Sequence, residues 1–356
     1  MIYNIQGLRL IAAFFIVLAH IILFGNEKYS LNQPGLDKPA DFFMIGVDIF
    51  FIISGFIMIH TRSCTNSASE NSVSTSWIKD AIHFFYKRAT RIYPVYWLLC
   101  LALLPIFFLF PGWINSGADE PTSLFHSFFL IPHKSVPLIM VAWTLEYEMF
   151  FYLVFALTIG LTVKKQIFTL TCLFAALVLA GIGIPSLQDS APLALITSSF
   201  LLYFIAGMWL AYLYNKLPHS KLAIALGAIA LILSIYCASF YKLGEIDRFM
   251  HFGCTAILIV TLTLMFERAK IIGRKSIMLW GGNISYSLYL LHVLALSACG
   301  RFIAHFIDGG PMLATLFCIA SITSSLIGAT VLFYFFERPA MKLLRRIEPF
   351  KRRSAQ

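Results

Sequence analysis

The sequence predicts an all-α polytopic membrane protein with about ten transmembrane helices and with both termini in the cytoplasm. Of the 356 residues, 59% are hydrophobic and 12% are charged, whereas a soluble domain carries roughly 25% charged residues. The mean hydropathy is +0.81. Apolar runs of about 20 residues recur along the whole chain, and a helix of that length crosses about 30 Å of hydrocarbon. These observations exclude a soluble globular fold and a disordered chain, and they argue against a membrane barrel, whose strands alternate polar and apolar residues.

The apolar runs define ten expected spans in chain order. They are Ile5–Phe24, Phe42–His60, Ile92–Phe110, Leu138–Leu161, Gln166–Ile184, Ala194–Tyr214, Leu222–Phe240, His251–Phe266, Met278–Ile303 and Met312–Phe336. A shorter run, Leu124–Ile131, ends at Pro132, and we expect an interfacial helix there on the side opposite the N-terminus. The Ser- and Asn-rich stretch Thr61–Asp80 is expected to be a flexible cytoplasmic loop. We expect one transmembrane domain, residues 1–340, and a basic cytoplasmic tail, residues 341–356.

The basic residues orient the bundle. With the N-terminus in the cytoplasm, most of the 27 Lys and Arg residues fall in cytoplasmic loops or in the C-terminal tail. The opposite side holds only Lys28, Lys38, Lys134, Lys242, Arg248 and Arg301. This bias favours an even number of spans, because an odd number would leave the basic tail outside. The net charge of +10 is therefore explained by topology and by contact with anionic lipids, and it does not indicate nucleic-acid binding.

Ionisable residues inside the spans are rare, and each costs about 2.5–3.5 kcal/mol at mid-bilayer, so they tend to face the bundle interior. Arg9 and His20 are eleven positions apart on the first span. At 100° per residue they lie on one helix face, about 16 Å apart along the axis. One interpretation is a topology anchor with a hydrogen-bonded core histidine. The functional interpretation is a cytoplasmic anion clamp below a buried base.

Asp48 lies in the second span, which runs inward, so it is at a depth similar to that of His20. If the two spans are neighbours, the carboxylate can accept a hydrogen bond from the imidazole. Such a bond fixes the tautomer and leaves the other nitrogen as a base. The alternative is a structural aspartate bonded to the backbone or to a serine. The adjacent Ser54-Gly55 pair is expected to allow close helix packing.

Two acids, Glu146 and Glu148, lie in the apolar fourth span and point about 200° apart, so both cannot face one small site. One of them can face a cavity while the other pairs elsewhere or is protonated. His292, in the ninth span, is expected at mid-bilayer, where it either bonds one of these acids or is a satisfied core histidine.

Arg88 and Arg91 precede the third span and share a helix face, since they are three residues apart. Their guanidinium groups are suited to gripping a phosphate, although an ordinary cluster of positive charge at the cytoplasmic surface is the alternative. No metal site is expected. The seven cysteines include no C-x-x-C pair, and six lie in apolar stretches, so they are interpreted as small buried hydrophobic residues.

Together these residues resemble the acyltransferase 3 family of integral membrane acyltransferases, over nearly the whole chain. The motifs that carry the resemblance are Arg9 through His20, Gly46-Val47-Asp48-Ile49-Phe50-Phe51 through Ser54-Gly55-Phe56, Arg88-x-x-Arg91 with Ile92 and Pro94, Trp143-Thr144-Leu145 with Glu148, and Ser285-Tyr286-Ser287-Leu288-Tyr289-Leu290-Leu291-His292. The glutamate of the family motif matches Glu148, which leaves Glu146 as a local extra. In length the chain is more similar to the exopolysaccharide-modifying acetyltransferases of the succinoglycan type than to members with an additional esterase-like domain.

The resemblance implies ten core helices and an O-acetyltransferase of the bacterial inner membrane. The acyl group, usually acetyl, would move from cytoplasmic acetyl-CoA to a hydroxyl of a lipid-linked or surface carbohydrate, with no metal. The expected catalytic residues are His20, Asp48 and Glu148. The expected acetyl-CoA-binding residues are Arg9, Arg88 and Arg91.

The physical interpretation agrees, because CoA is a cytoplasmic polyanion and the basic mouth is cytoplasmic. His20 would deprotonate the attacking sugar hydroxyl, a step that contributes about 10²–10⁴-fold.

Two other classes of protein remain as alternatives. A proton-coupled secondary transporter would use Asp48, Glu148 and His20 as a relay. The absence of internal repeat symmetry and the gathering of basic residues at one mouth argue against it. A non-enzymatic scaffold of a polysaccharide assembly complex would not depend on any buried ionisable residue.

Overall fold

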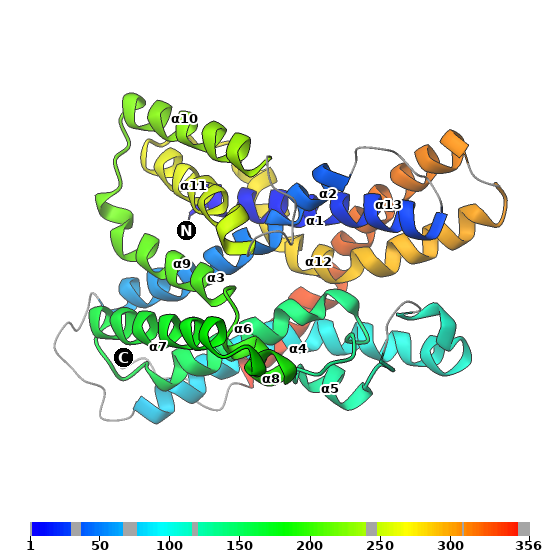
Figure 1. Cartoon of the computed structure of the whole chain (residues 1–356), viewed down its shortest axis with the longest axis horizontal. Helices are drawn as coiled ribbons and strands as arrows, with labels where there is room; N and C mark the ends of the chain where they lie inside the picture. Colours follow the sequence, from blue (N-terminus) through cyan, green and yellow to red (C-terminus); the bar gives the residue numbers. More distant parts are fainter. Residues whose placement is uncertain are drawn as a thin grey trace. The chain divides into compact units, whose positions relative to one another are not determined.

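The computed structural model describes residues 2–29, 37–66, 77–115, 120–239, 248–307 and 310–347. Every regular element in these ranges is helical, and no strand occurs in them (Figure 1). Within the same ranges, ten helical segments are long and apolar enough to cross a membrane. The predicted all-α architecture with ten spans is therefore confirmed, while the side on which each terminus lies stays a prediction.

The described ranges contain fourteen α-helices. Their bounds are α1 (Tyr3–Tyr29), α2 (Asp37–Phe43), α3 (Ile45–Asn66), α4 (Trp77–Leu109), α5 (Leu124–Phe129), α6 (Trp143–Leu157), α7 (Val163–Gly183), α8 (Ala191–Ile196), α9 (Leu201–Leu213), α10 (Lys221–Ala238), α11 (Arg248–Arg268), α12 (Lys275–Ala304), α13 (Gly310–Leu332) and α14 (Arg338–Arg346). A short π-helix, Phe333–Glu337, links α13 to α14.

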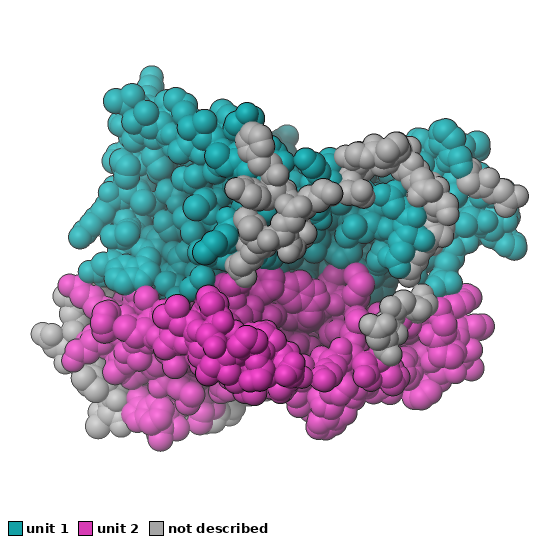
Figure 2. All heavy atoms as spheres, in the orientation of Figure 1, with its two compact units in different colours: residues 1–57, 202–331 teal, residues 58–201, 332–356 magenta. Residues whose placement is uncertain are grey.

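The chain divides into two compact units (Figure 2). Unit 1 comprises residues 1–57 and 202–331, and unit 2 comprises residues 58–201 and 332–356. The predicted boundary at residue 340 stays a prediction. Residues 348–356 of the expected basic tail, residues 67–76 of the expected loop and Phe240 at the end of the seventh expected span lie outside the described residues.

Unit 1 is built around close helix packing. Helix α1 lies against α12, α2 and α11, and α10 packs on α11. Helices α3 and α9 cross with their backbones in contact, because a Cβ atom added to Gly55 would lie 2.3 Å from the Phe204 carbonyl oxygen and one added to Gly207 would lie 2.0 Å from the Ile52 carbonyl oxygen. Small residues at such crossings replace side-chain bulk with backbone proximity. The expectation of close packing at Gly55 is confirmed.

Unit 2 contains the long helix α4, which packs against α6 and α14. The carboxyl end of α6 is held by Arg62, whose guanidinium donates to the carbonyl oxygens of Ile159 (2.7 Å) and Leu161 and to the side-chain oxygen of Gln166. Gln166 is fully buried and donates in turn to the Phe155 carbonyl oxygen (3.0 Å). The last carbonyl oxygens of a helix have no hydrogen-bond donor within the helix. The side chains of Arg62 and Gln166 donate the missing hydrogen bonds here.

Helix α4 begins at Trp77, well before the Ile92 predicted as the start of the third span. The apolar run marks only the membrane-crossing part of this helix. The stretch before it contains neither glycine nor proline ahead of Pro94, so no residue stops the helix, and Arg88 and Arg91 lie on a helix as predicted. The expected flexible loop Thr61–Asp80 is wrong at both ends, since residues 61–66 belong to α3 and residues 77–80 belong to α4.

The sixth expected span is broken between α8 and α9. At the break the Thr197 hydroxyl donates to the Leu193 carbonyl oxygen (2.7 Å), and the Ser198 hydroxyl accepts from the Phe200 amide (3.3 Å). Such local side-chain bonds compete with regular helical bonding, and hydropathy alone does not detect them.

The interfacial segment Leu124–Ile131 does contain a short helix, α5, and Leu130 ends it with a left-handed backbone conformation (φ 52°). Its position relative to a membrane stays a prediction.

The cysteines differ from expectation. Of the six that the structure describes, Cys100 is buried, Cys172, Cys237 and Cys254 are exposed, and the other two are half-buried. A hydrophobic residue in a membrane span can face lipid as well as the core, so apolar surroundings in the sequence do not imply burial.

Candidate active site

Arg9 and His20 both lie on α1, which is one uninterrupted helix of unit 1. Arg9 donates to the side-chain oxygen of Gln6 (3.4 Å), and Gln6 lies directly against Gly282 of α12. His20 meets the same helix at His292. His20 therefore contacts α12 directly, whereas the printed hydrogen bond of Arg9 is to Gln6 of its own helix.

The His20 ring is buried, with 6% of its surface exposed. Its Nδ1 atom lies 2.8 Å from the carbonyl oxygen of Ile16. A carbonyl oxygen only accepts hydrogen bonds, so the neutral ring carries its proton on Nδ1 and keeps the lone pair on Nε2. In the part of the chain that the structure describes, no hydrogen bond engages Nε2. The ring thus has the tautomer that a base acting through Nε2 needs.

His292 on α12 is the neighbour of His20. It is fully buried, its Nδ1 lies 3.2 Å from the Leu288 carbonyl oxygen, and its Nε2 lies 3.3 Å from Nδ1 of His20. The two ring centroids are 5.0 Å apart, and the planes meet at 63°. His292 is therefore the hydrogen-bonded core histidine that the sequence analysis gave as one alternative. One of its partners is His20, the predicted base.

Asp48 has a different partner from the one predicted. The fully buried carboxylate forms a two-point ion pair with Arg248, Nε to Oδ1 at 2.9 Å and Nη2 to Oδ2 at 3.1 Å. Arg248 also donates to the Met44 carbonyl oxygen (2.7 Å). The predicted hydrogen bond between Asp48 and His20 is absent from the described part of the chain. A buried carboxylate gains more from a charged, forked guanidinium than from a neutral imidazole.

Arg248 was predicted to lie on the far side of the membrane, at a loop. It begins α11 and reaches the first turn of α3. The sequence did contain a signal for this ion pair. A buried acid needs a cation, and Arg248 is a lone arginine at the start of a span.

In unit 2, Arg88 of α4 lies between two aromatic rings, 5.5 Å from the centroid of Phe84 and 6.0 Å from that of Tyr152. Its Nε atom is buried and has no hydrogen-bond partner in the residues described. Glu148 and Tyr152 of α6 are close enough to act electrostatically on this guanidinium. The predicted residues Arg88 and Glu148 therefore lie within electrostatic reach of each other.

Two further arginines act on Arg88, namely the predicted Arg91 and Arg345 of α14. Helix α14 is held on α4 by the Tyr86 hydroxyl, which donates to the Leu344 carbonyl oxygen (3.1 Å). The sequence interpretation missed Arg345, because it assigned this segment to a tail. Three like charges held near one another repel unless an anion balances them.

Glu146 has different neighbours from Glu148. Its charge acts on Tyr96 and Tyr147, whereas that of Glu148 acts on Arg88. The prediction that the two acids point apart stays a prediction.

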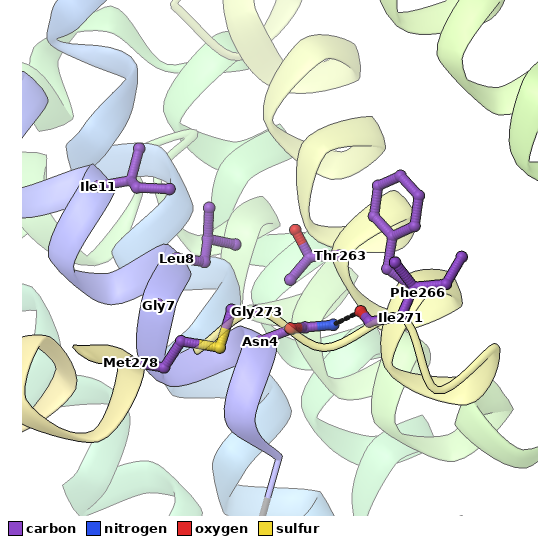
Figure 3. Close-up of a pocket in the computed structure, with 9 residues that line it drawn as sticks. All are labelled: Asn4, Gly7, Leu8, Ile11, Thr263, Phe266, Ile271, Gly273 and Met278. Atoms are coloured by element: carbon purple, nitrogen blue, oxygen red, sulfur yellow. Dashed lines mark hydrogen bonds between the residues drawn. The ribbon is translucent and has the colours of Figure 1, made fainter. Parts of the chain in front are cut away.

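A shallow pocket of about 280 Å³ lies between α1, α11 and α12 (Figure 3). Its lining is almost entirely apolar, and the Asn4 side chain points toward the Ile271 carbonyl oxygen, to which it donates (2.9 Å). None of the predicted site residues lines it. Across the described ranges, no group of three or more His, Cys, Asp or Glu side chains is placed to hold a metal ion.

The residues that the structure describes contain ten helices long and apolar enough to cross a membrane, with the buried His20 on the first and with Arg88 and Arg91 on the third, which is the architecture of a multi-pass membrane protein. Residues 2–333 match the family model described as the acyltransferase domain of the acyltransferase 3 family, and the chain belongs to this family of O-acyltransferase enzymes.

The exopolysaccharide production protein ExoZ of Rhizobium meliloti (strain 1021) is 31% identical over 319 residues, which cover 85% of this chain and 89% of the relative. A candidate acetyltransferase, ORF330 of Acidianus two-tailed virus, is 25% identical over 308 residues, 82% of each chain. No solved structure matches the chain significantly.

Proposed function

We propose that the protein transfers an acetyl group from cytoplasmic acetyl-CoA to a hydroxyl of a lipid-linked or surface carbohydrate, in the inner membrane of a bacterium. Membership of the acyltransferase family supports the reaction class. One relative is named for exopolysaccharide production and another as an acetyltransferase, which supports a carbohydrate acceptor and an acetyl donor.

The observation that carries the proposal is the tautomer of His20. With Nδ1–H directed at the Ile16 carbonyl oxygen, Nε2 offers a lone pair from a buried ring. Nε2 takes the proton of the sugar hydroxyl while the hydroxyl oxygen bonds to the thioester carbon. The carbon–sulfur bond then breaks, and the CoA thiolate leaves with the proton that Nε2 held. General-base help of this kind contributes about 10²–10⁴-fold in rate.

The arginine cluster of unit 2 is the proposed site for the phosphates of the donor. Arg88, Arg91 and Arg345 supply three positive charges that need an anion in addition to Glu148, the acid that acts on Arg88. The buried Nε of Arg88 is a hydrogen-bond donor that needs an acceptor. Phosphate oxygens meet both needs. Arg9, at the other end of α1 from His20, is proposed to contact the donor as well.

Asp48 and Glu148 enter this proposal as positioning residues. Asp48 fixes Arg248 through two hydrogen bonds, and Glu148 stabilises the charge of Arg88. Their substitution is expected to disturb the arginines rather than to remove a group that touches the reacting atoms.

The test is the acetyl content of the cell-surface and lipid-linked carbohydrate, measured by mass spectrometry in cells without the gene and in cells that carry it. We expect acetylated sugars only when the chain is present. Identical spectra from the two strains would contradict the proposed acceptor class, and proton-driven solute uptake by vesicles without acetyl-CoA would favour a transporter instead.

A further inference from the structure

We infer that His292 is the positioning residue of His20, which it holds in the active tautomer and stabilises when the ring becomes charged. The inference rests on the proposed role of His20 as the base. It gives to a neutral histidine the task that a carboxylate performs in a serine–histidine–aspartate triad.

The hydrogen-bond directions follow from the two backbone carbonyls. The Leu288 oxygen, 3.2 Å from Nδ1 of His292, can only accept, so that nitrogen carries the proton. The lone pair of His292 is then on Nε2, which lies 3.3 Å from Nδ1 of His20. Nδ1 of His20 carries its proton for the same reason, because the Ile16 oxygen lies 2.8 Å away. His20 therefore donates one shared proton to the Ile16 oxygen and to Nε2 of His292.

Reversing the tautomer of His20 would be unfavourable on both sides. The lone pair would move to Nδ1, where it would face the Ile16 oxygen and the lone pair of His292 at 2.8 and 3.3 Å. Two acceptors would then meet each other at a buried position, and each would lose a hydrogen bond. His292 adds to a preference that a single backbone carbonyl would leave weaker.

His20 alone takes up and releases the proton of the sugar hydroxyl. During attack, the sugar proton bonds to Nε2 of His20, and the imidazolium donates more strongly from Nδ1 to Nε2 of His292. His292 stays neutral throughout and releases nothing. The proton on Nε2 passes to the departing CoA thiolate, and His20 returns to its starting tautomer.

Burial explains why a histidine suits this place. Both rings lie in membrane spans, and 0% of His292 and 6% of His20 are exposed. A second carboxylate here would need its own cation, as Asp48 needs Arg248. A neutral acceptor orients the base without that requirement. The extensive packing of α1 on α12 holds the two rings together.

The experiment uses the full chain in membrane vesicles, with labelled acetyl-CoA and the carbohydrate of the same membranes as acceptor. His292→Phe keeps an aromatic ring and removes the acceptor, His292→Gln keeps an acceptor oxygen, and His305→Phe is the control on an exposed position of the same helix region. We expect His292→Phe to lower kcat by about 10²-fold with an unchanged KM for acetyl-CoA. His292→Gln should recover at least about tenfold of that loss, and His305→Phe should behave like the wild type.

The double variant separates the possible failures. If His292 acts through His20, adding His292→Phe to His20→Ala causes no further loss. An inactive His20→Ala with a fully active His292→Phe would overturn the inference and leave the proposed function standing. An active His20→Ala would overturn both. If His292→Phe does not accumulate in the membrane, His292→Leu is compared with His292→Gln, and equal rates for these two would also overturn the inference.

Discussion

Asp48 and His20 are buried polar side chains of unit 1, and each has a partner that suits its charge. Asp48 is charged and meets the guanidinium of Arg248, while the neutral ring of His20 meets a carbonyl and another histidine. Spacing and depth in the sequence placed Asp48 and His20 at one level. They could not show that α11 brings a cation to the same level, because that depends on how the helices pack.

The ion pair leads to a prediction on stability. Arg248→Ala leaves the fully buried carboxylate of Asp48 without its cation, and uncompensated buried charges cost about 3–5 kcal/mol. We expect a clearly lower midpoint of thermal unfolding for the purified protein in detergent. The control is Arg274→Ala, which changes an exposed arginine in the same unit.

A second substitution checks the cause. Asp48→Asn combined with Arg248→Met removes both charges, and it should restore part of the loss that Arg248→Ala produces. Equal unfolding midpoints for Arg248→Ala and the wild type would show that the pair does not stabilise the fold.

Among the elements, the spans that are long and uniformly apolar were predictable, because about 20 apolar residues suffice to define a membrane helix. Local chemistry decided the rest. The start of α4 at Trp77 and the break between α8 and α9 depend on charged or hydroxyl-bearing residues that hydropathy counts only as polar. Helix α14 follows the apolar run. Its contact with α4 through Tyr86 is a tertiary contact, which a local sequence pattern cannot predict.

Helix α14 leads to a prediction on donor binding. Arg345 acts on Arg88, and it is exposed, so a phosphate can reach it. Losing one charge-assisted contact of about 1.5 kcal/mol should weaken acetyl-CoA binding about tenfold. Titration of purified Arg345→Ala with acetyl-CoA measures the change.

Arg346→Ala is the matched control, since it removes the adjacent exposed arginine of the same helix. Acetyl-CoA affinities that are equal in both variants and the wild type would remove Arg345 from the donor site. If Arg88→Ala also bound acetyl-CoA normally, the whole arginine cluster would lose its proposed role.

At the scale of the whole molecule, composition was a sufficient guide to fold class, because hydrocarbon accepts few architectures. The order of motifs along the chain was a sufficient guide to the family, which the match over residues 2–333 confirms. The arrangement of the site was less accessible. The sequence predicted His20, Arg88 and Glu148 as site residues. The structure places Glu148 within electrostatic reach of Arg88 and His292 within hydrogen-bond distance of His20, and these neighbours depend on how the helices pack.

In the proposed reaction, His20 accepts the proton of the acceptor hydroxyl during acetyl transfer. The most direct test of this step is the rate of acetyl transfer from labelled acetyl-CoA into membrane carbohydrate by His20→Ala, with acetyl-CoA binding measured on the same preparation. We expect unchanged acetyl-CoA binding and a transfer rate lowered by about 10²–10⁴-fold. A correctly inserted His20→Ala that binds acetyl-CoA and transfers acetyl at the wild-type rate would contradict it.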